Sequence, residues 1–344
     1  MPRLALCLAA ALGLAACAPG APSAGPSGEP LVSTFSIVAV DTTTGEIGVA
    51  VQSKFPNVRA IVPWVEAGVG AVATQSFARL EYGRRGLALM REGATAEEAM
   101  RIAVRTDPDP PVRQVGMVDA AGQAATFTGA EAFEWRGGRV GGLDAIAGPG
   151  AIVTGHGYAA QGNILVSRET VDAIAAAYEA AEGTLAQRLT AALVAGGAAG
   201  GDKRGEQSAA LVVHREGAGY DGSDVIVDIS VYDHATPLAE LERLMRLNDL
   251  YFTDSDPADM VDVTPAIARE LQAIWAARGF YDGPADGVVD AEFQSILTDY
   301  MGWENYDLRI DEVAGVDLAA GEALRIDREV LDDIRSVFRD GRYK

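Results

Sequence analysis

The stretch Thr34-Phe35-Ser36-Ile37-Val38-Ala39-Val40 is an apolar run, and Ile47-Gly48-Val49-Ala50-Val51-Gln52-Ser53 is a second one after a turn at residues 41–45. Two β-prone runs on either side of a turn that ends in glycine predict a β-hairpin. Two more apolar runs follow, at residues 60–65 and 70–74. The hairpin therefore opens the folded part of the chain.

The later pattern alternates between pairs of strands and pairs of helices. Helical periodicity covers residues 82–91 and 95–105, and Thr95 with Glu98 forms a capping-box signature at the start of the second helix. A second hairpin follows, with strands at 115–118 and 123–127. Two alanine-rich helices come next, at 168–181 and 185–195, and then two strands at 208–214 and 225–231. This order predicts antiparallel sheets covered by helices rather than a doubly wound parallel sheet. The fold class that fits is α+β, a four-layer αββα sandwich.

The first sixteen residues have the pattern of a targeting segment, with Arg3 before an apolar run over residues 4–14. Eleven residues are too few to span a bilayer. The run ends in Leu14-Ala15-Ala16-Cys17, which resembles the lipobox of bacterial lipoproteins, where the cysteine is acylated and becomes the first mature residue. The alternative is an ordinary cleaved signal peptide. We expect export, and lipidation at Cys17.

Residues 18–30 are small and rich in proline and glycine, so we expect residues 17–32 to be a disordered tether. The chain has 344 residues and two cysteines, one of them in the leader, so the mature protein would keep only Cys17. A formal net charge of −21 would repel phosphate backbones, which makes nucleic acid an unexpected partner. We expect contact with a membrane only through the lipid anchor.

Five blocks of the chain carry a resemblance to a known family. They are residues 34–39, 48–53, 62–75, 161–163 and 201–210. In this order they resemble the "domain of unknown function 1028" family, which is grouped with the N-terminal nucleophile hydrolases. The resemblance implies the αββα sandwich, here over residues 33–247, and an amide-bond hydrolase with a small amide substrate.

In N-terminal nucleophile hydrolases, a Thr, Ser or Cys at the start of the first strand attacks the substrate and its own α-amine is the general base. The resemblance makes Thr34 the candidate nucleophile. Many family members begin with Met-Thr-Phe-Ser, whereas here Ser33 and a long tether precede Thr34. The base therefore exists only if the chain is cut before Thr34, and that cut would separate the domain from a lipid at Cys17. The alternative is that Thr34 is only the first residue of a strand.

Other candidates lie where the strand order brings residues near the start of the first strand. Gln52 and Ser53 end the second strand and would orient the nucleophile, and Asn163 would stabilise a developing oxyanion. Asp202, Arg204 and Gln207 lie in a glycine-rich turn and would bind a substrate carboxylate. For Gln52 and Ser53 the alternative is a strand end that becomes polar as it leaves the sheet. For Asn163 it is a turn residue, and for the three residues of the glycine-rich turn it is hydrogen bonding to the loop backbone.

Several other chemistries do not fit the sequence. Residues 196–205 lack the spacing of a P-loop, and no dinucleotide fingerprint is present. The three histidines are not paired at metal-ligand spacing, so we expect neither a metal site nor a cofactor. Eight glycines between residues 137 and 157 indicate an inserted flexible loop, either a flap over the site or an inert surface insertion.

The composition changes after Asn248. Residues 248–344 contain 22 acidic and 9 basic residues, a net charge of −13. Helical patterns at 267–278, 290–300 and 328–339 predict a small, mainly helical domain over residues 248–344. Its Gly-Phe-Tyr-Asp-Gly turn at 279–283 resembles modules that bind peptidoglycan. The resemblance implies peptidoglycan as a partner, with Tyr281, Trp303 and Tyr306 as candidate sugar contacts.

Together these features predict a lipoprotein of the bacterial cell envelope, facing the periplasm or the exterior. It would carry an N-terminal nucleophile amide hydrolase and a peptidoglycan-binding module. The alternative is a non-catalytic, peptidoglycan-binding envelope protein that kept the sandwich fold.

Overall fold

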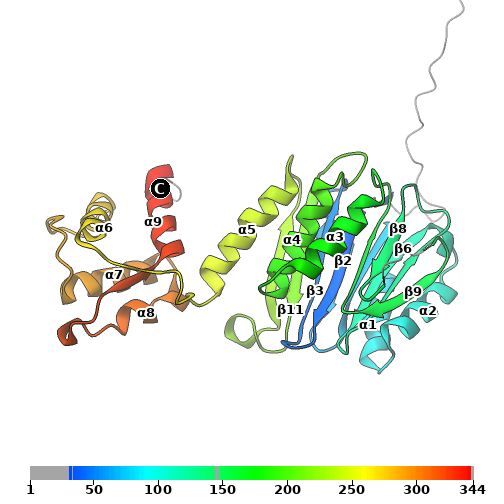
Figure 1. Cartoon of the computed structure of the whole chain (residues 1–344), viewed down its shortest axis with the longest axis horizontal. Coiled ribbons are helices and arrows are strands. Elements are labelled where there is room, and N and C mark those ends of the chain that lie inside the picture. Colours follow the sequence, from blue (N-terminus) through cyan, green and yellow to red (C-terminus); the bar gives the residue numbers. More distant parts are fainter. Residues whose placement is uncertain (1–30, 33, 144–145, 147, 342–344) are drawn as a thin grey trace, which may run out of the picture.

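The structure is a computed structural model that describes residues 31–32, 34–143, 146 and 148–341. The predicted leader, Cys17 and all but the last residues of the predicted tether lie outside these residues. The chain folds into an α+β part with two antiparallel sheets and a mainly helical C-terminal part (Figure 1). Helix α5 (Pro237–Phe252) leads from one to the other and passes through the predicted boundary between residues 247 and 248.

The first sheet, which we call the β2 sheet, contains the predicted opening hairpin. In spatial order its strands are β12 (Val225–Val231), β11 (Ser208–His214), β3 (Glu46–Ser53), β2 (Thr34–Asp41), β10 (Tyr158–Gly162) and β8 (Gly137–Val140). Strands β2 and β3 pair antiparallel, from Thr34 opposite Ser53 to Asp41 opposite Glu46. Asp41 Oδ1 accepts the Thr43 N–H at 2.9 Å, and Gly45 has a φ of +81° that favours glycine. The turn chemistry thus fixes the hairpin register.

The second sheet, which we call the β5 sheet, faces the first. Its order is β1 (Leu31–Val32), β5 (Gly70–Phe77), β6 (Arg113–Asp119), β7 (Gln123–Thr128) and β9 (Ile152–His156), and β4 (Pro63–Glu66) also pairs with β5. Strands β2 and β10 of the first sheet contact β5, β6 and β7 of the second. Strands with both faces covered are almost wholly buried, as the burial of β5 shows.

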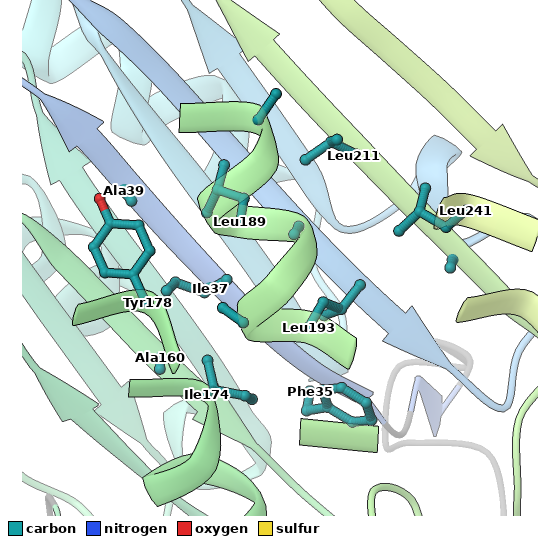
Figure 2. Close-up of a cluster of buried hydrophobic side chains, with 14 of the residues drawn as sticks. Phe35, Ile37, Ala39, Ala160, Ile174, Tyr178, Leu189, Leu193, Leu211 and Leu241 are labelled. Atoms are coloured by element: carbon teal, nitrogen blue, oxygen red, sulfur yellow. The ribbon is translucent and has the colours of Figure 1, made fainter. Parts of the chain in front are cut away.

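Helices cover the outer faces of both sheets. Helices α1 (Glu81–Arg91) and α2 (Ala96–Thr106) pack on the β5 sheet, and α3 (Glu169–Ala180) and α4 (Leu185–Ala198) pack on the β2 sheet. Capping boxes start α2 and α4. Figure 2 shows Leu189 and Leu193 of α4 lying over the β2 sheet, in the cluster that contains Phe35. The predicted helices and antiparallel sheets are confirmed.

The prediction of a flexible loop over residues 137–157 was wrong for the two ends of the segment, whereas residues 141–143, 146 and 148–151 between them lie in no helix or strand. Its ends form β8 and β9, edge strands of the two sheets. A Cβ added at Gly138 would lie 2.6 Å from Thr126 Oγ1, and one at Gly155 would lie 2.3 Å from the carbonyl oxygen of Gly141. Glycine is needed here because backbones approach closely. The segment closes one side of the paired sheets.

The C-terminal part has its own apolar core. Its helices are α6 (Pro265–Ala277), α7 (Ala291–Trp303), α8 (Asp311–Ala314) and α9 (Arg328–Asp340), beside the short strand pair β13 (Met260–Asp262) and β14 (Arg325–Asp327). The helices predicted from periodicity, α6, α7 and α9, are confirmed. Trp275 and Tyr300 are fully or almost fully buried in this core. Tyr306 is also buried and donates to Asp333 Oδ2 at 2.7 Å, so it packs rather than faces solvent, whereas Trp303 is 71% exposed.

Five single-turn 3₁₀ helices complete the elements of the residues that the structure describes. They are Val58–Ala60, Pro110–Val112, Tyr220–Gly222, Asp307–Arg309 and Leu318–Ala320. Among the described residues, no helix is both long and apolar enough to cross a membrane.

Candidate functional site

Thr34 begins β2, and its side chain points between the two sheets. The side chain is fully buried, and Thr34 Oγ1 donates to Ser53 Oγ at 3.0 Å on the neighbouring strand. The Thr34 carbonyl oxygen accepts the Asn163 backbone N–H at 3.0 Å and Gln75 Nε2 at 3.2 Å. The structure thus brings three of the predicted site residues, Thr34, Ser53 and Asn163, to one place.

A set of buried amide and hydroxyl side chains surrounds this place, and we call it the amide cluster. Its members are Ser36, Gln75, Gln114, Gln161 and Asn163, each fully buried. Ser36 Oγ donates to Gln75 Oε1 at 2.7 Å, and Gln161 Nε2 donates to Ser36 Oγ at 2.7 Å. Gln114 Oε1 accepts from Gln75 Nε2 and from Asn163 Nδ2, both at 2.9 Å. The cluster links both sheets through hydrogen bonds rather than apolar contact.

Strand alternation explains why the cluster forms here. Successive residues of a strand face opposite sides, so Thr34 and Ser36 face the β5 sheet while Phe35 faces the helices. Gln75 lies opposite Gln114 in the β5 sheet, and Gln161 lies opposite Ser36 in the β2 sheet. The amide groups of three strands therefore meet in one layer. Sequence reasoning missed Gln75, Gln114 and Gln161 as site residues, although a lone glutamine in an apolar strand is a usable signal.

Backbone strain accompanies the cluster. Ser76 and Ile164 have φ values of 70° and 53°, a region that residues other than glycine rarely adopt. Ser76 follows Gln75, and Ile164 follows Asn163, so both lie beside the start of β2. The Ser76 hydroxyl is buried and has no hydrogen-bond partner among the described residues. Such strain costs of order 1–3 kcal/mol per residue and gathers at functional sites.

The chain before Thr34 belongs to the other sheet. Leu31 pairs with Phe77 and Val32 with Ser76, so β1 extends the edge of the β5 sheet beyond β4. Thr34 then begins the β2 sheet. In the uncut chain, β1 therefore pairs with the strained residue Ser76, next to the amide cluster.

The turn at residues 202–207 lies against the same end of β3. Arg204 Nη2 and Asp202 Oδ2 are 3.1 Å apart, and the Asp202 side chain is fully buried in this ion pair. Arg204 Nη2 also donates to the Lys54 carbonyl oxygen at 3.3 Å. The Gln207 N–H donates to the Ser53 carbonyl oxygen at 3.1 Å. Asp202, Arg204 and Gln207 thus lie next to Ser53, as the strand order predicted.

Gln52 is the predicted site residue that the structure does not bring to the Thr34 side chain. It lies opposite Phe35, so its side chain shares the helix-facing side of the sheet. The side chain is fully buried, and neither atom of its amide has a hydrogen-bond partner among the described residues. Because Ser53 takes the position opposite Thr34, alternation excludes its neighbour from that position.

Comparison with known proteins places this geometry in a family. The model described as "Family of unknown function (DUF1028)" matches residues 34–241, from the first residue of β2 into α5. This chain belongs to the DUF1028 family. A second model, described as "Putative peptidoglycan binding domain", matches residues 251–332. A peptidoglycan-binding domain is therefore present beside the DUF1028 domain, which supports peptidoglycan as a partner and a place in the cell envelope.

A solved structure supports the fold. The crystal structure of protein SPO2555 from Silicibacter pomeroyi, also described as DUF1028, is 28% identical to this chain with a TM-score of 0.54. The match covers 63% of this chain and 89% of that one. None of the curated proteins that were compared matches this DUF1028 chain.

Proposed function

We propose that the DUF1028 domain is an amide-bond hydrolase of the N-terminal nucleophile type, with Thr34 as the nucleophile. The observation that carries the proposal is the position of Thr34, the first residue of β2, beside Ser53 and the amide cluster. Two sheets face each other with helices on both outer faces, which supports the four-layer αββα sandwich of these hydrolases. The function rests on the site rather than on the layers, because one fold hosts many reactions.

The proposed reaction begins with a cut before Thr34. The freed α-amine, with an ordinary pKa of about 7.7–8.0, is partly neutral near pH 7 and accepts the proton of Thr34 Oγ1. Oγ1 then attacks the substrate carbonyl carbon, and the amine returns the proton to the leaving nitrogen. Water then attacks the resulting ester and regenerates Thr34.

Three neighbours support this reaction. Ser53 Oγ lies 3.0 Å from Thr34 Oγ1 and would hold the nucleophile in place. The Asn163 side-chain amide would donate to the oxyanion, which requires it to exchange its bond with Gln114. Arg204, already oriented by Asp202, would bind a carboxylate of a small substrate with Gln207 beside it.

The proposed cut would also open the site. Thr34 is fully buried in the uncut chain, and β1 pairs with Phe77 and Ser76 next to it. After a cut before Thr34, the described contact that would hold β1 in place is its short backbone pairing with Phe77 and Ser76. Loss of β1 would free the edge of β5 and expose the end of β2. Processing would therefore create the base and clear the approach in one step.

We also propose that the chain is exported and lipidated at Cys17. The leader pattern and the peptidoglycan-binding domain support the same compartment. A cut before Thr34 would release the hydrolase from the lipid, so an anchored molecule and an active molecule would be different forms. The tether would hold the unprocessed form near the membrane.

One observation favours the alternative, a non-catalytic envelope protein that binds peptidoglycan. With the chain intact, Thr34 Oγ1 is buried and hydrogen-bonded, so no substrate carbonyl can reach it. If no cut occurs, the amide cluster would serve only to join the sheets.

N-terminal sequencing and intact mass of the protein from its native compartment separate the two functions. We expect a species that begins at Thr34, and we expect Thr34→Ala to abolish it, because attack on the preceding peptide bond needs a hydroxyl. Thr34→Ser should retain it, and Thr43→Ala, an exposed threonine in the turn after β2, should process as the wild type does. An acylated Cys17 terminus without any species starting at Thr34 would contradict the catalytic mechanism.

A further inference from the structure

The edge of the β5 sheet beside Thr34 is covered by the chain's own N-terminal segment. Strand β1 pairs antiparallel with β5, Leu31 with Phe77 and Val32 with Ser76. Strand β4 takes the same edge of β5 over residues 70–73, because β6 pairs along the opposite edge. The place that β1 fills is therefore the end of this edge that β4 leaves open, and β1 leads directly into the start of β2.

This end of the edge is held in shape from inside the sheet. Ser76 pairs with Arg113 of β6, and Arg113 Nη1 donates to the Phe77 carbonyl oxygen at 2.8 Å. Arg113 is almost fully buried, and its Nε lies 3.1 Å from Asp107 Oδ2. Because these contacts do not involve β1, the edge would keep its shape when β1 leaves. A preformed edge leaves little ordering cost for a strand that replaces β1.

The chemistry of the proposed cut indicates which kind of group the site accepts. Thr34 Oγ1 attacks the carbonyl carbon of the preceding residue, the C–N bond to Thr34 breaks, and the hydroxyl proton passes to the freed α-amine. The product is an ester of Thr34 whose acyl group is the peptide that ends at residue 33. Water then cleaves this ester to a carboxylate and restores the hydroxyl. Hydrolysis of a substrate passes through an ester at the same oxygen, so the first acyl group that the site holds is a peptide.

We propose that the substrate is a short peptide whose acyl part adds a strand to β5 in the place that β1 leaves. The inference rests on the proposed hydrolase function and names its substrate class. Backbone groups of the peptide pair with Ser76 and Phe77, as those of β1 do in the uncut chain. The carbonyl carbon of the last acyl residue then lies at Thr34 Oγ1. Until the cut, β1 occupies the place of the substrate.

The neighbouring strand limits the length of this peptide. The Thr74 N–H donates to the Val62 carbonyl oxygen at 3.2 Å, so the edge is already in use at Thr74. At the other end, β5 itself stops at Phe77. A peptide with two residues opposite Phe77 and Ser76 therefore reaches the end of the free edge with its third residue. A longer acyl part would find no further strand to pair with.

The probe is acetyl-Leu-Val-Ser joined to aminomethylcoumarin by an amide, which copies residues 31–33. It is given to the full chain after N-terminal sequencing has identified the species that begins at Thr34. We expect kcat/KM to be about tenfold higher than for acetyl-Ser-aminomethylcoumarin, a gain that one or two backbone hydrogen bonds supply. An alanine added before the leucine should change kcat/KM by less than about twofold, because it would lie beyond Phe77. Thr34→Ala should cleave none of the peptides and is the control for hydrolysis elsewhere.

N-methylation separates strand pairing from apolar contact. In an antiparallel pair, one residue directs both its N–H and its C=O at the partner strand, and the next residue directs both away. N-methylation of one of the two residues, leucine or valine, should therefore lower kcat/KM about fivefold or more, because it replaces a donor at the edge of β5. N-methylation of the other should leave kcat/KM within about twofold of the parent peptide. The two peptides are matched controls, since each adds a single methyl group.

The outcomes separate this inference from the proposed function. A species that begins at Thr34 but cleaves the short and long peptides equally, or cleaves neither, would overturn strand addition and leave Thr34 as the proposed nucleophile. Equal rates for the two N-methyl peptides would also overturn strand addition. Absence of the species that begins at Thr34 would overturn both, because β1 would then stay in the place of the substrate.

Discussion

At the end where β2 begins, the two faces of the β2 sheet are built from the same strands and held by different forces. On the helix-facing side, Phe35 and Ile37 pack with Leu189 and Leu193 of α4 in an apolar cluster (Figure 2). On the other side, the same strand contributes Thr34 and Ser36 to hydrogen bonds among buried polar groups. The alternation of β2 alone separates the two environments.

The difference indicates that the polar end of the face toward the β5 sheet has a role other than stability. An apolar face gains roughly 25 cal/mol for each Å² of surface removed from water, and many side chains of suitable size can fill it. A buried amide gains little net free energy even when fully bonded, and it costs about 1–3 kcal/mol when it loses a partner. Beyond the cluster the same interface is apolar, with Val38 and Val40 of β2 in one buried core with Val118 of the β5 sheet, so stability alone would not require buried amides. The amide cluster is therefore where we look for function.

The largest expected effect is on the apolar face. Phe35→Ala should lower the free energy of unfolding by about 3–5 kcal/mol, because it leaves a cavity beneath α4 that neighbouring side chains only partly fill. Urea denaturation of the full chain measures the change. The control is Phe252→Ala, since Phe252 is 55% exposed and should lose less than about 1 kcal/mol. Equal losses in both variants would contradict this account of the face.

A smaller loss is expected on the polar face. Gln114 Nε2 donates to Gly162 O at 2.8 Å and to Thr128 Oγ1 at 2.9 Å, while Gln114 Oε1 accepts two bonds. Gln114→Met keeps the length of the side chain and removes all of these bonds. We expect a loss of about 2–4 kcal/mol in the same denaturation experiment, because several buried groups lose their partner at once.

Gln123→Met is the matched control for this substitution. Gln123 lies on β7 of the same sheet but is exposed, so its replacement should change the free energy of unfolding by less than about 0.5 kcal/mol. A Gln114 variant as stable as this control would show that the amide cluster does not hold the sheets together.

Local signals in the sequence predicted much of this fold. The opening hairpin follows from two β-prone runs and a turn that ends in glycine, and α2 follows from its capping box. Strands β8 and β10 were not predicted, because their glycine and alanine residues carry no apolar alternation. Strand β10 is fixed by pairing with β2, and β8 is fixed by pairing with β10. The pairing of β10 with β2 joins residues more than 100 positions apart, which no local window contains.

The candidate site was predictable where local pairing sets it, and not where it depends on the stacking of the two sheets. Thr34 and Ser53 meet because the hairpin register pairs them, and Asn163 follows β10 to the same end. Gln75 and Gln114 pair across β5 and β6 and reach the site only when the two sheets stack. The role given to Gln52 did not apply the alternation rule, which allows only one of two successive residues to face Thr34.

Gln52 offers the test with the smallest expected effect. Its substitution should raise the free energy of unfolding, whereas the substitutions above should lower it. Its buried amide has no partner among the described residues, so Gln52→Met removes an unsatisfied group and should raise the free energy of unfolding by about 1 kcal/mol. Gln75→Met is the comparison within the amide cluster, on β5 of the facing sheet. It breaks bonds to Thr34 and Gln114 and should lower the same quantity by about 2 kcal/mol. The same change of residue would then stabilise the helix-facing side of the β2 sheet and destabilise the layer between the two sheets. A loss at both positions would instead mean that Gln52 is bonded in solution, and the helix-facing side would no longer be a purely apolar layer.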